Sequence, residues 1–243
     1  MIKRAYIKTF SHYLQRDMEI LVFGDRGKPI IFFPTRTARF YDYENWKVIQ
    51  AVEQQLNAGY YQIYCVDSVD KQSFYNKEIN AAERIIQHEL YENYILHELV
   101  PLIKKQNHHP ELMLAGCSLG AYHATNLIFR HPYLFTQLLA MSGRYDLTIT
   151  LPHFKDLFDG FMNDAIYYHM PSKFMPNLND EYILQQLREK RLTFIVGNAD
   201  AFLQNNLEMH HTLSQKFIPH QFYIWDGEAH KPHAWCRMAQ LHF

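Results

Sequence analysis

The sequence is poor in the features that mark secreted, membrane-bound or nucleic-acid-binding proteins. Its three cysteines, Cys65, Cys117 and Cys236, are an odd number without paired spacing, which argues against a disulfide framework. The formal net charge is only −1, so nothing indicates a nucleic-acid partner or an anionic membrane surface. No apolar run has the length of a signal peptide or a membrane span. These absences predict a soluble, cytoplasmic protein.

Glycine is also scarce, with nine in 243 residues, yet two of them flank one serine in the sequence GCSLG at 116–120. In a nucleophile elbow, a serine lies on a sharp turn between a strand and a helix. Its neighbours must be small because the strand and the helix nearly touch there. The same pattern also arises by chance in ordinary loops, so the surrounding sequence has to decide.

Strand-like and helical segments alternate along most of the chain. The β-rich runs are AYIKTF, MEILVFG, PIIFFPT, YQIYCV, ELMLAG, QLLAMSG, RLTFIVG and QFYIW. Short links join the first runs, which suits antiparallel strands at one edge, and the later runs alternate with helical patterns. We therefore expect an eight-stranded, mostly parallel sheet with helices on both faces. Because no repeat or linker interrupts the pattern, residues 1–243 are expected to form a single α/β domain.

Two segments between these strands have a pattern of their own. Residues 44–59 place Trp46, Ile49, Val52 and Leu56 on one helical face, which predicts a single helix. The aromatic-rich stretch at about 145–189 is longer than an ordinary connection. We interpret it as a cap-like insertion over a substrate pocket, with additional core as the alternative.

The residues around GCSLG provide what a catalytic serine needs. Ser118 follows the fifth strand and opens a helical pattern, which is the context of an elbow. A serine hydroxyl needs a histidine base, and the histidine needs an acid that fixes its tautomer. Asp200 follows the seventh strand, and His230 and His233 follow the eighth. This order of serine, acid and histidine on loops after successive strands is the order that the elbow motif requires.

Three choices remain open from position alone. Asp146, after the sixth strand, is an alternative acid, and Cys117 is an alternative nucleophile, although a cysteine there is more often an apolar core residue. Pro232 suits the first turn of a helix, which would place His233 on that helix and leave His230 on the approach to Ser118. We favour His230 as the base and His233 as a substrate contact.

The developing oxyanion requires backbone donors. The N–H of Leu119, directly after the serine, is expected to be one, and the N–H of Arg36, after the third strand, the other. The side chains of Arg36 and Arg39 are either contacts for an acidic substrate group or ordinary solvated charges, and Arg39 is the candidate substrate contact. Asp67 and Asp70, after the fourth strand, are expected to orient that loop rather than take part in chemistry.

The fifteen histidines do not by themselves indicate a metal. The adjacent pairs His108–His109 and His210–His211 cannot easily direct both rings at one ion, and no HExxH or Cys/His cluster accompanies them. We expect neither a metal nor a cofactor.

The chain resembles the esterase D-like group of α/β-hydrolases over nearly its full length. The segments that carry the resemblance are SHYLQRDMEILVFGDRGKPIIFFPT, YCVDSVDKQSFYN, AGCSLGAYHATNLIFRHPYLF and EAHKPHAW. The resemblance implies the α/β-hydrolase fold, with Ser118 as nucleophile, Asp200 as acid and His230 as base. Two features depart from the group. Thr37 and Ala38 replace expected glycines, and KPH stands where relatives resemble H-D-W-P.

Together these features predict a serine carboxylic-ester hydrolase that acts on a small-molecule ester through an acyl-enzyme on Ser118. An acyltransferase with the same triad is a close variant, because another nucleophile can replace water at the acyl-enzyme. A non-catalytic binding protein on a hydrolase fold is the alternative from another class.

Overall fold

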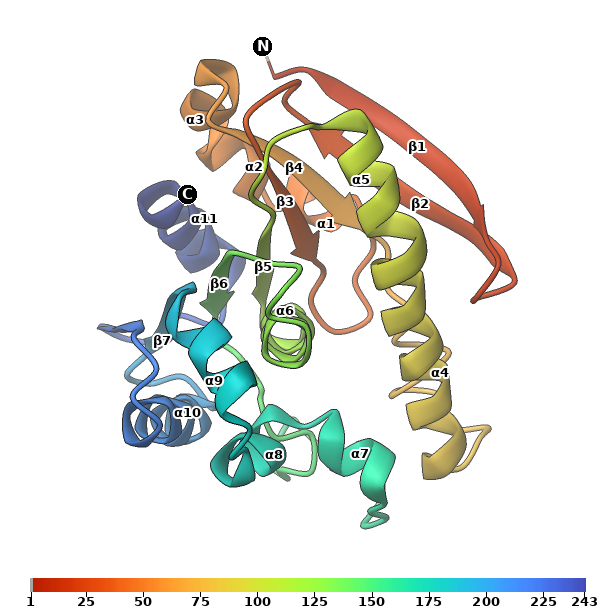
Figure 1. The fold of residues 1–243 in the computed structure, drawn as a ribbon, viewed down its shortest axis with the longest axis vertical. Helices are drawn as coiled ribbons and strands as arrows, with labels where there is room; N and C mark the ends of the chain where they lie inside the picture. The colour runs from red at the N-terminus through yellow and green to blue at the C-terminus, as the bar shows by residue number, and fades with distance from the viewer. Residues whose placement is uncertain (1) are drawn as a thin grey trace.

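A computed structural model describes residues 2–243. Eight strands form one sheet in the order β1-β2-β4-β3-β5-β6-β7-β8 (Figure 1). The strands are β1 (Arg4–Ser11), β2 (Arg16–Phe23), β3 (Lys28–Phe33), β4 (Tyr61–Val66), β5 (Met113–Cys117), β6 (Gln137–Met141), β7 (Arg191–Gly197) and β8 (Gln221–Trp225). Strand β2 runs antiparallel to β1 and β4, and the pairs from β4 across to β8 are parallel. The expected eight-stranded, mostly parallel sheet is confirmed.

Helices cover both faces of this sheet. The helices are α1 (Asp42–Asn45), α2 (Val48–Ala51), α3 (Glu53–Ala58), α4 (Ala81–Tyr94), α5 (Val100–Gln106), α6 (Leu119–Arg130), α7 (Asp164–Tyr168), α8 (Pro171–Asn177), α9 (Glu181–Arg188), α10 (Leu203–Gln215) and α11 (Pro232–His242). A π-helical turn, Ile95–Leu99, joins α4 to α5 directly before Pro101. This turn fits a proline that cannot donate the usual helical hydrogen bond.

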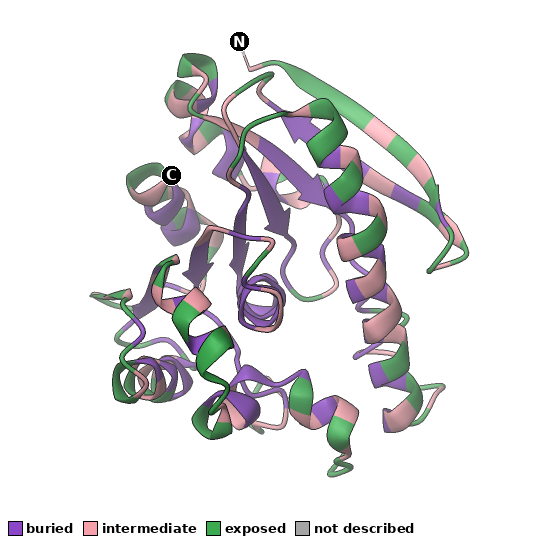
Figure 2. Ribbon diagram, viewed as in Figure 1, coloured by how far each residue is buried: buried purple, intermediate pink, exposed green. Residues whose placement is uncertain are grey.

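Alternate residues of the central strands face opposite layers of core. On β3, Ile31 and Phe33 pack into the cluster that contains the inner faces of α4, α5, α6 and α10. Ile30 and Phe32 pack into the cluster that contains α2 and α11. This division follows from the two-residue period of a strand. The strands are accordingly buried throughout the centre of the molecule, and exposed residues gather on the outer helix faces and on β1 (Figure 2).

The prediction that residues 44–59 form one continuous helix is wrong. The segment forms three short helices, interrupted at Lys47, which has a left-handed φ of 65°, and at Val52. The apolar positions are nevertheless right, because Ile49, Val52 and Leu56 are all buried. Packing against the sheet has preserved the buried face while breaking the helix.

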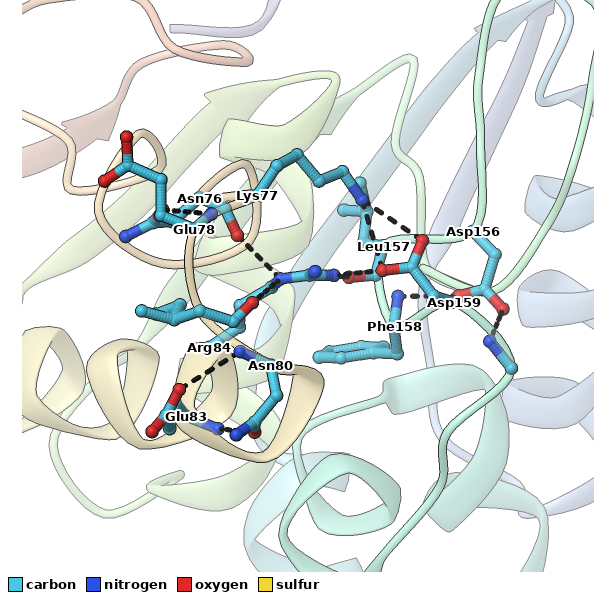
Figure 3. A network of polar contacts seen from close by, with 12 residues as sticks. Asn76, Lys77, Glu78, Asn80, Glu83, Arg84, Asp156, Leu157, Phe158 and Asp159 are labelled. Carbon is cyan, nitrogen blue, oxygen red and sulfur yellow. Dashed lines mark hydrogen bonds and ion pairs between the residues drawn. The ribbon is translucent and has the colours of Figure 1, made fainter.

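Residues 142–190, which we call the β6–β7 connection, contain α7, α8 and α9. Part of this connection is held against the start of α4 by Arg84 (Figure 3). The buried guanidinium of Arg84 donates to the carbonyl oxygens of Asn76 and Leu157, at 2.8 and 2.9 Å, and pairs with Asp159 at 2.7 Å. The connection thus packs against the domain, and its role as a cap stays a prediction. Among residues 2–243, no helix is long and apolar enough to cross a membrane.

Candidate active site

Ser118 occupies a strained turn between β5 and α6. Its φ of 56° and ψ of −117° lie outside the regions that serine ordinarily adopts. The Ser118 N–H donates to the Met141 carbonyl at 2.9 Å, so the turn stays tied to the neighbouring strand β6. The side chain is therefore positioned by main-chain geometry at the carboxyl edge of the sheet, where active sites of open α/β sheets collect.

Both glycines of GCSLG are required because three backbone segments lie very close together at this turn. A Cβ atom on Gly116 would lie 2.2 Å from the carbonyl carbon of Gly120. A Cβ atom on Gly120 would lie 2.2 Å from the carbonyl oxygen of Phe33, at the end of β3. No side chain fits at either position, so strands β3 and β5 and helix α6 can meet only if both residues are glycine.

The structure brings Ser118, His230 and Asp200 together from three separate turns. His230 lies between β8 and α11, and its Nε2 is 2.9 Å from Ser118 Oγ. Its Nδ1 is 3.2 Å from each carboxylate oxygen of Asp200, which follows β7. This arrangement keeps Nε2 available as a proton acceptor when Nδ1 carries the hydrogen that Asp200 accepts.

Asp200 is buried but stabilised as an anion. Burial raises the pKa of its carboxyl group, but the hydrogen bond with His230 and its charge, with a backbone N–H from Phe202, outweigh burial and lower the pKa below its usual value. The Phe202 N–H donates to Asp200 Oδ1 at 2.9 Å. Asp146, the alternative acid, instead pairs with Lys173 at 2.8 Å and accepts from the Thr148 N–H.

Three aromatic rings surround the imidazole of His230. The ring centroids of Phe202 and Trp235 are each 5.6 Å from that of His230, and the centroid of Phe154 is 6.1 Å away. Phe154 and Phe202 also contact each other edge to face at 4.5 Å. These rings limit the orientations open to the imidazole. The contacts of Phe154 and Phe202 with His230 could not be found from the sequence, because both residues are far from it along the chain.

Asp70 contacts both the loop after β3 and helix α6. Asp70 Oδ2 accepts the Thr37 N–H at 3.0 Å, while Asp70 Oδ1 lies 3.2 Å from His123 Nε2 on α6. Asp70 thereby joins the loop to the helix that Ser118 opens, as expected for an orienting residue. Within residues 2–243, no hydrogen bond uses the backbone N–H of Arg36 or Leu119. Their role as oxyanion donors stays a prediction.

Arg39, the candidate substrate contact, forms ion pairs within the protein. Its guanidinium pairs with Asp67 at 2.7 Å and with Glu19 at 2.8 Å, and Asp67 is almost completely buried. Arg39 therefore neutralises a buried carboxylate, and its role as a substrate contact stays a prediction. His233 is exposed on α11, as its position after Pro232 predicted, and its role as a substrate contact stays a prediction.

Cys117 belongs to the core. Its side chain is completely buried, and its backbone N–H donates to the hydroxyl of Tyr43 at 3.1 Å. Burial raises the pKa of the Cys117 thiol far above its ordinary value, which opposes formation of a nucleophilic thiolate.

One potential metal-ligating group was missed from the sequence. His88, Glu92 and His169 are buried, and one ligand atom from each lies within 4.8 Å of the others. His88 and Glu92 share one face of α4, but His169 comes from the distant end of α7, and no local motif could reveal it. Glu92 Oε1 already lies 3.0 Å from both Arg130 and His131, so this carboxylate is also part of a polar network between helices.

A broad hollow lies away from Ser118. It has a volume of about 620 Å³ and is lined by Gln137, Arg191 and Gln221, the first residues of β6, β7 and β8. It therefore opens at the amino ends of the parallel strands, opposite the edge at which ligands of such sheets bind.

Comparisons with known proteins identify the family and the fold of the chain. Residues 29–228 match the Esterase family model, described as Putative esterase. A ferulic acid esterase has a similar structure, at 17% identity and a TM-score of 0.79, covering 100% of this chain and 96% of that one. An S-formylglutathione hydrolase from Agrobacterium tumefaciens is similar at 13% identity and a TM-score of 0.76, covering 99% and 93%.

A third similar structure is a fluorophosphonate-binding serine hydrolase from Staphylococcus aureus, at 16% identity and a TM-score of 0.70, covering 99% of this chain and 96% of that one. At such identities these likenesses show the fold alone, and they confirm the expected α/β-hydrolase fold. No curated protein matches the chain in sequence.

Proposed function

The chain belongs to the Esterase family, and on that premise we propose that it is a serine carboxylic-ester hydrolase with Ser118, His230 and Asp200 as its triad. The premise itself agrees with the resemblance of the sequence to esterase D-like proteins, and it identifies the chain as an ester-hydrolysing enzyme. The proposal adds which residues carry out the reaction and by which intermediate.

The observation that supports the triad is one continuous chain of short contacts. Ser118 Oγ lies 2.9 Å from His230 Nε2, and His230 Nδ1 lies 3.2 Å from the Asp200 carboxylate. Both distances permit proton transfer or charge stabilisation without rearrangement of the fold. Among residues 2–243, Asp200 is the acid within hydrogen-bonding distance of His230, whereas Asp146 is held by Lys173 and Thr148.

In the first half of the reaction, Ser118 Oγ attacks the carbonyl carbon of the ester while His230 Nε2 takes the hydroxyl proton. The carbonyl oxygen becomes an oxyanion, which the backbone N–H groups of Leu119 and Arg36 stabilise. The C–O bond to the alcohol then breaks, and the alcohol oxygen takes the proton from His230. The acyl group remains on Ser118 as an ester.

In the second half, water replaces the alcohol. His230 Nε2 takes a proton from the water as its oxygen attacks the acyl carbon, and the same two N–H groups stabilise the second oxyanion. The bond to Ser118 Oγ breaks, Oγ recovers the proton from His230, and the carboxylic acid leaves. Asp200 stays ionised throughout and stabilises the imidazolium that forms in each half.

The test is reaction with a fluorophosphonate probe together with hydrolysis of a small aryl ester. Ser118→Ala should fold normally, lose labelling and lose roughly 10⁴-fold or more in kcat. Ser214→Ala, an exposed serine on α10, is the matched control and should retain both activities. A folded wild-type protein that neither labels nor hydrolyses esters would indicate a binding protein. Transfer of the acyl group to an added alcohol faster than to water would indicate the acyltransferase.

A further inference from the structure

A buried arginine lies directly beside the serine turn. Arg144 follows β6, and its backbone N–H points to the Ser118 carbonyl at 3.4 Å. Only 2% of the residue is exposed. Its Nη2 atom lies within hydrogen-bonding distance of three carbonyl oxygens, those of Leu147 and Ile149 at 3.1 Å and that of Lys155 at 2.6 Å.

Arg144 forms no direct ion pair with any described residue, although the charge of Asp146 acts on it from a longer distance. Among residues 2–243, no acidic group lies within ion-pair distance of it, and its buried Nε has no hydrogen-bond partner. The adjacent carboxylate, Asp146, is bound to Lys173 and Thr148. Burial lowers the pKa of the Arg144 guanidinium. A buried cation without a counter-ion is costly, and an anion placed next to it would remove much of that cost.

A second guanidinium group, that of Arg36, lies near the same aromatic ring as Arg144, the ring of Phe154. The Cζ atom of Arg36 is 5.6 Å from the Phe154 ring centroid, and that of Arg144 is 5.7 Å from it. Arg36 is exposed and forms no ion pair with any described residue. Tyr75 lies by both arginines, since its ring centroid is 6.0 Å from Arg36 Cζ and its hydroxyl interacts with both guanidinium groups.

The ring shared by the two arginines also packs on the proposed catalytic base. Phe154 is 6.1 Å from the His230 ring, and Phe202, which contacts both Arg144 and His230, completes the group. Two positive charges therefore lie one aromatic ring away from the imidazole that faces Ser118. Among residues 2–243, neither arginine is within ion-pair distance of Asp70, whose oxygens contact the Thr37 N–H and His123.

We propose that Arg36 and Arg144, with the Tyr75 hydroxyl, form an anion subsite that binds a carboxylate of the substrate. The enzyme accordingly hydrolyses esters that carry a carboxylate a few atoms from the scissile bond. Arg36 supplies the solvent-facing donors and recruits the substrate. Arg144 supplies a fixed positive charge, which is already desolvated and therefore interacts strongly with an anion. This inference rests on the proposed esterase function and adds a substrate class to it.

The test compares esters that differ only in a carboxylate. On the acyl side the pair is para-nitrophenyl hexanoate and the mono-para-nitrophenyl ester of adipic acid. On the alcohol side it is benzyl acetate and its para-carboxylate derivative. The wild-type protein should prefer the carboxylate ester of at least one pair by about tenfold in kcat/KM, and Arg36→Gln should remove most of that preference. Increasing salt should reduce it as well.

The ratio of the two kcat/KM values within a pair of esters isolates the effect of the Arg36 charge. Both esters use the same oxyanion donors, so any shift of the loop changes both rates alike. Lys104→Gln, which removes an exposed positive charge on α5, is the matched control and should keep the wild-type ratio. A wild-type ratio near one for both pairs, or a ratio that Arg36→Gln leaves unchanged, would overturn the subsite. Hydrolysis of the neutral esters alone would still support the esterase, so the two proposals can fail separately.

Discussion

The two regions that meet at Ser118 are held in place by different means. At the carboxyl ends of the strands, the turn at Ser118 is fixed by main-chain contact, because Gly120 leaves no space for a Cβ atom beside Phe33. The β6–β7 connection is fixed by two arginine side chains, Arg144 and Arg84, that donate to its carbonyl oxygens. The first region thus has one geometry that side chains cannot adjust, as catalysis requires. The second can change with the residues that hold it, which agrees with the substrate-binding role proposed for Arg144.

The sharpest contrast between the regions concerns their aspartates. Asp200→Asn, at the strand ends, should keep the fold but leave the His230 imidazole poorly oriented, which lowers kcat by up to roughly 10⁴-fold. Asp146→Asn, in the connection, should leave turnover near that of the wild type, because its carboxylate contacts Lys173 rather than His230. Steady-state hydrolysis of an aryl ester measures both. A large loss in Asp146→Asn with normal Asp200→Asn would reverse the assignment of the acid.

A glycine in each region tests how tightly the main chain is packed. Gly120→Ala should lower the free energy of unfolding by about 3 kcal/mol or more, because the new methyl group meets backbone atoms that cannot move aside. The gain in helix propensity, about 1 kcal/mol, is too small to compensate. Gly160→Ala in the connection meets open space, and only its φ of 81° opposes the change, at about 1 kcal/mol. Denaturant unfolding of the two variants should therefore give clearly different midpoints, and equal midpoints would contradict the comparison.

The smallest effect is expected at Asp159, in the network of Figure 3. Hydrogen bonds from Arg84 and then Lys77 lower the pKa of this exposed carboxyl group. Solvent screens the pairs, so Asp159→Asn should cost about 1 kcal/mol or less near neutral pH. Because the pKa is lowered on folding, this contribution is present above the unfolded value of about 3.9 and is lost as the pH falls through the folded value.

Unfolding of wild type and Asp159→Asn should accordingly differ most near neutral pH and converge in acid. Asp164→Asn, an exposed aspartate on α7 that forms no ion pair among the described residues, is the matched control. A difference that grows on acidification would contradict the direction of the pKa shift.

The sequence was informative where a short local pattern determines the structure. Glycine at positions 116 and 120 signals close backbone packing, and strand-like runs before Ser118, Asp200 and His230 locate all three at one edge of the sheet. The parallel pairing of β5 to β8 then makes their meeting nearly unavoidable, because parallel strands end on the same side. The choice of His230 over His233 likewise depended on Pro232, which begins a helix where it was expected.

The sequence was uninformative where long side chains choose between distant partners. Arg36 and Arg39 stand three positions apart in one loop, but Arg39 reaches the buried Asp67 and Arg36 reaches Phe154. No local pattern distinguishes them, since the choice depends on how strand β4 and the β6–β7 connection fold back. The helix break at Lys47 also depends on tertiary contacts. The helical periodicity predicted the buried residues correctly, but packing against the sheet interrupted the helix.

The contact between Gly120 and Phe33 also determines which positions of the chain can be changed in a redesign. Positions 116 and 120 accept no side chain, so a combinatorial library that includes them would consist mainly of unfolded members. Arg144 donates to the carbonyl oxygen of Leu147, but the side chain of Leu147 is buried in the core. Ile149 and Lys155 are held through their carbonyl oxygens in the same way, and their side chains are at least partly exposed and open to variation. Altered selectivity is best sought by mutating these residues, with the GCSLG turn left untouched as an invariant scaffold.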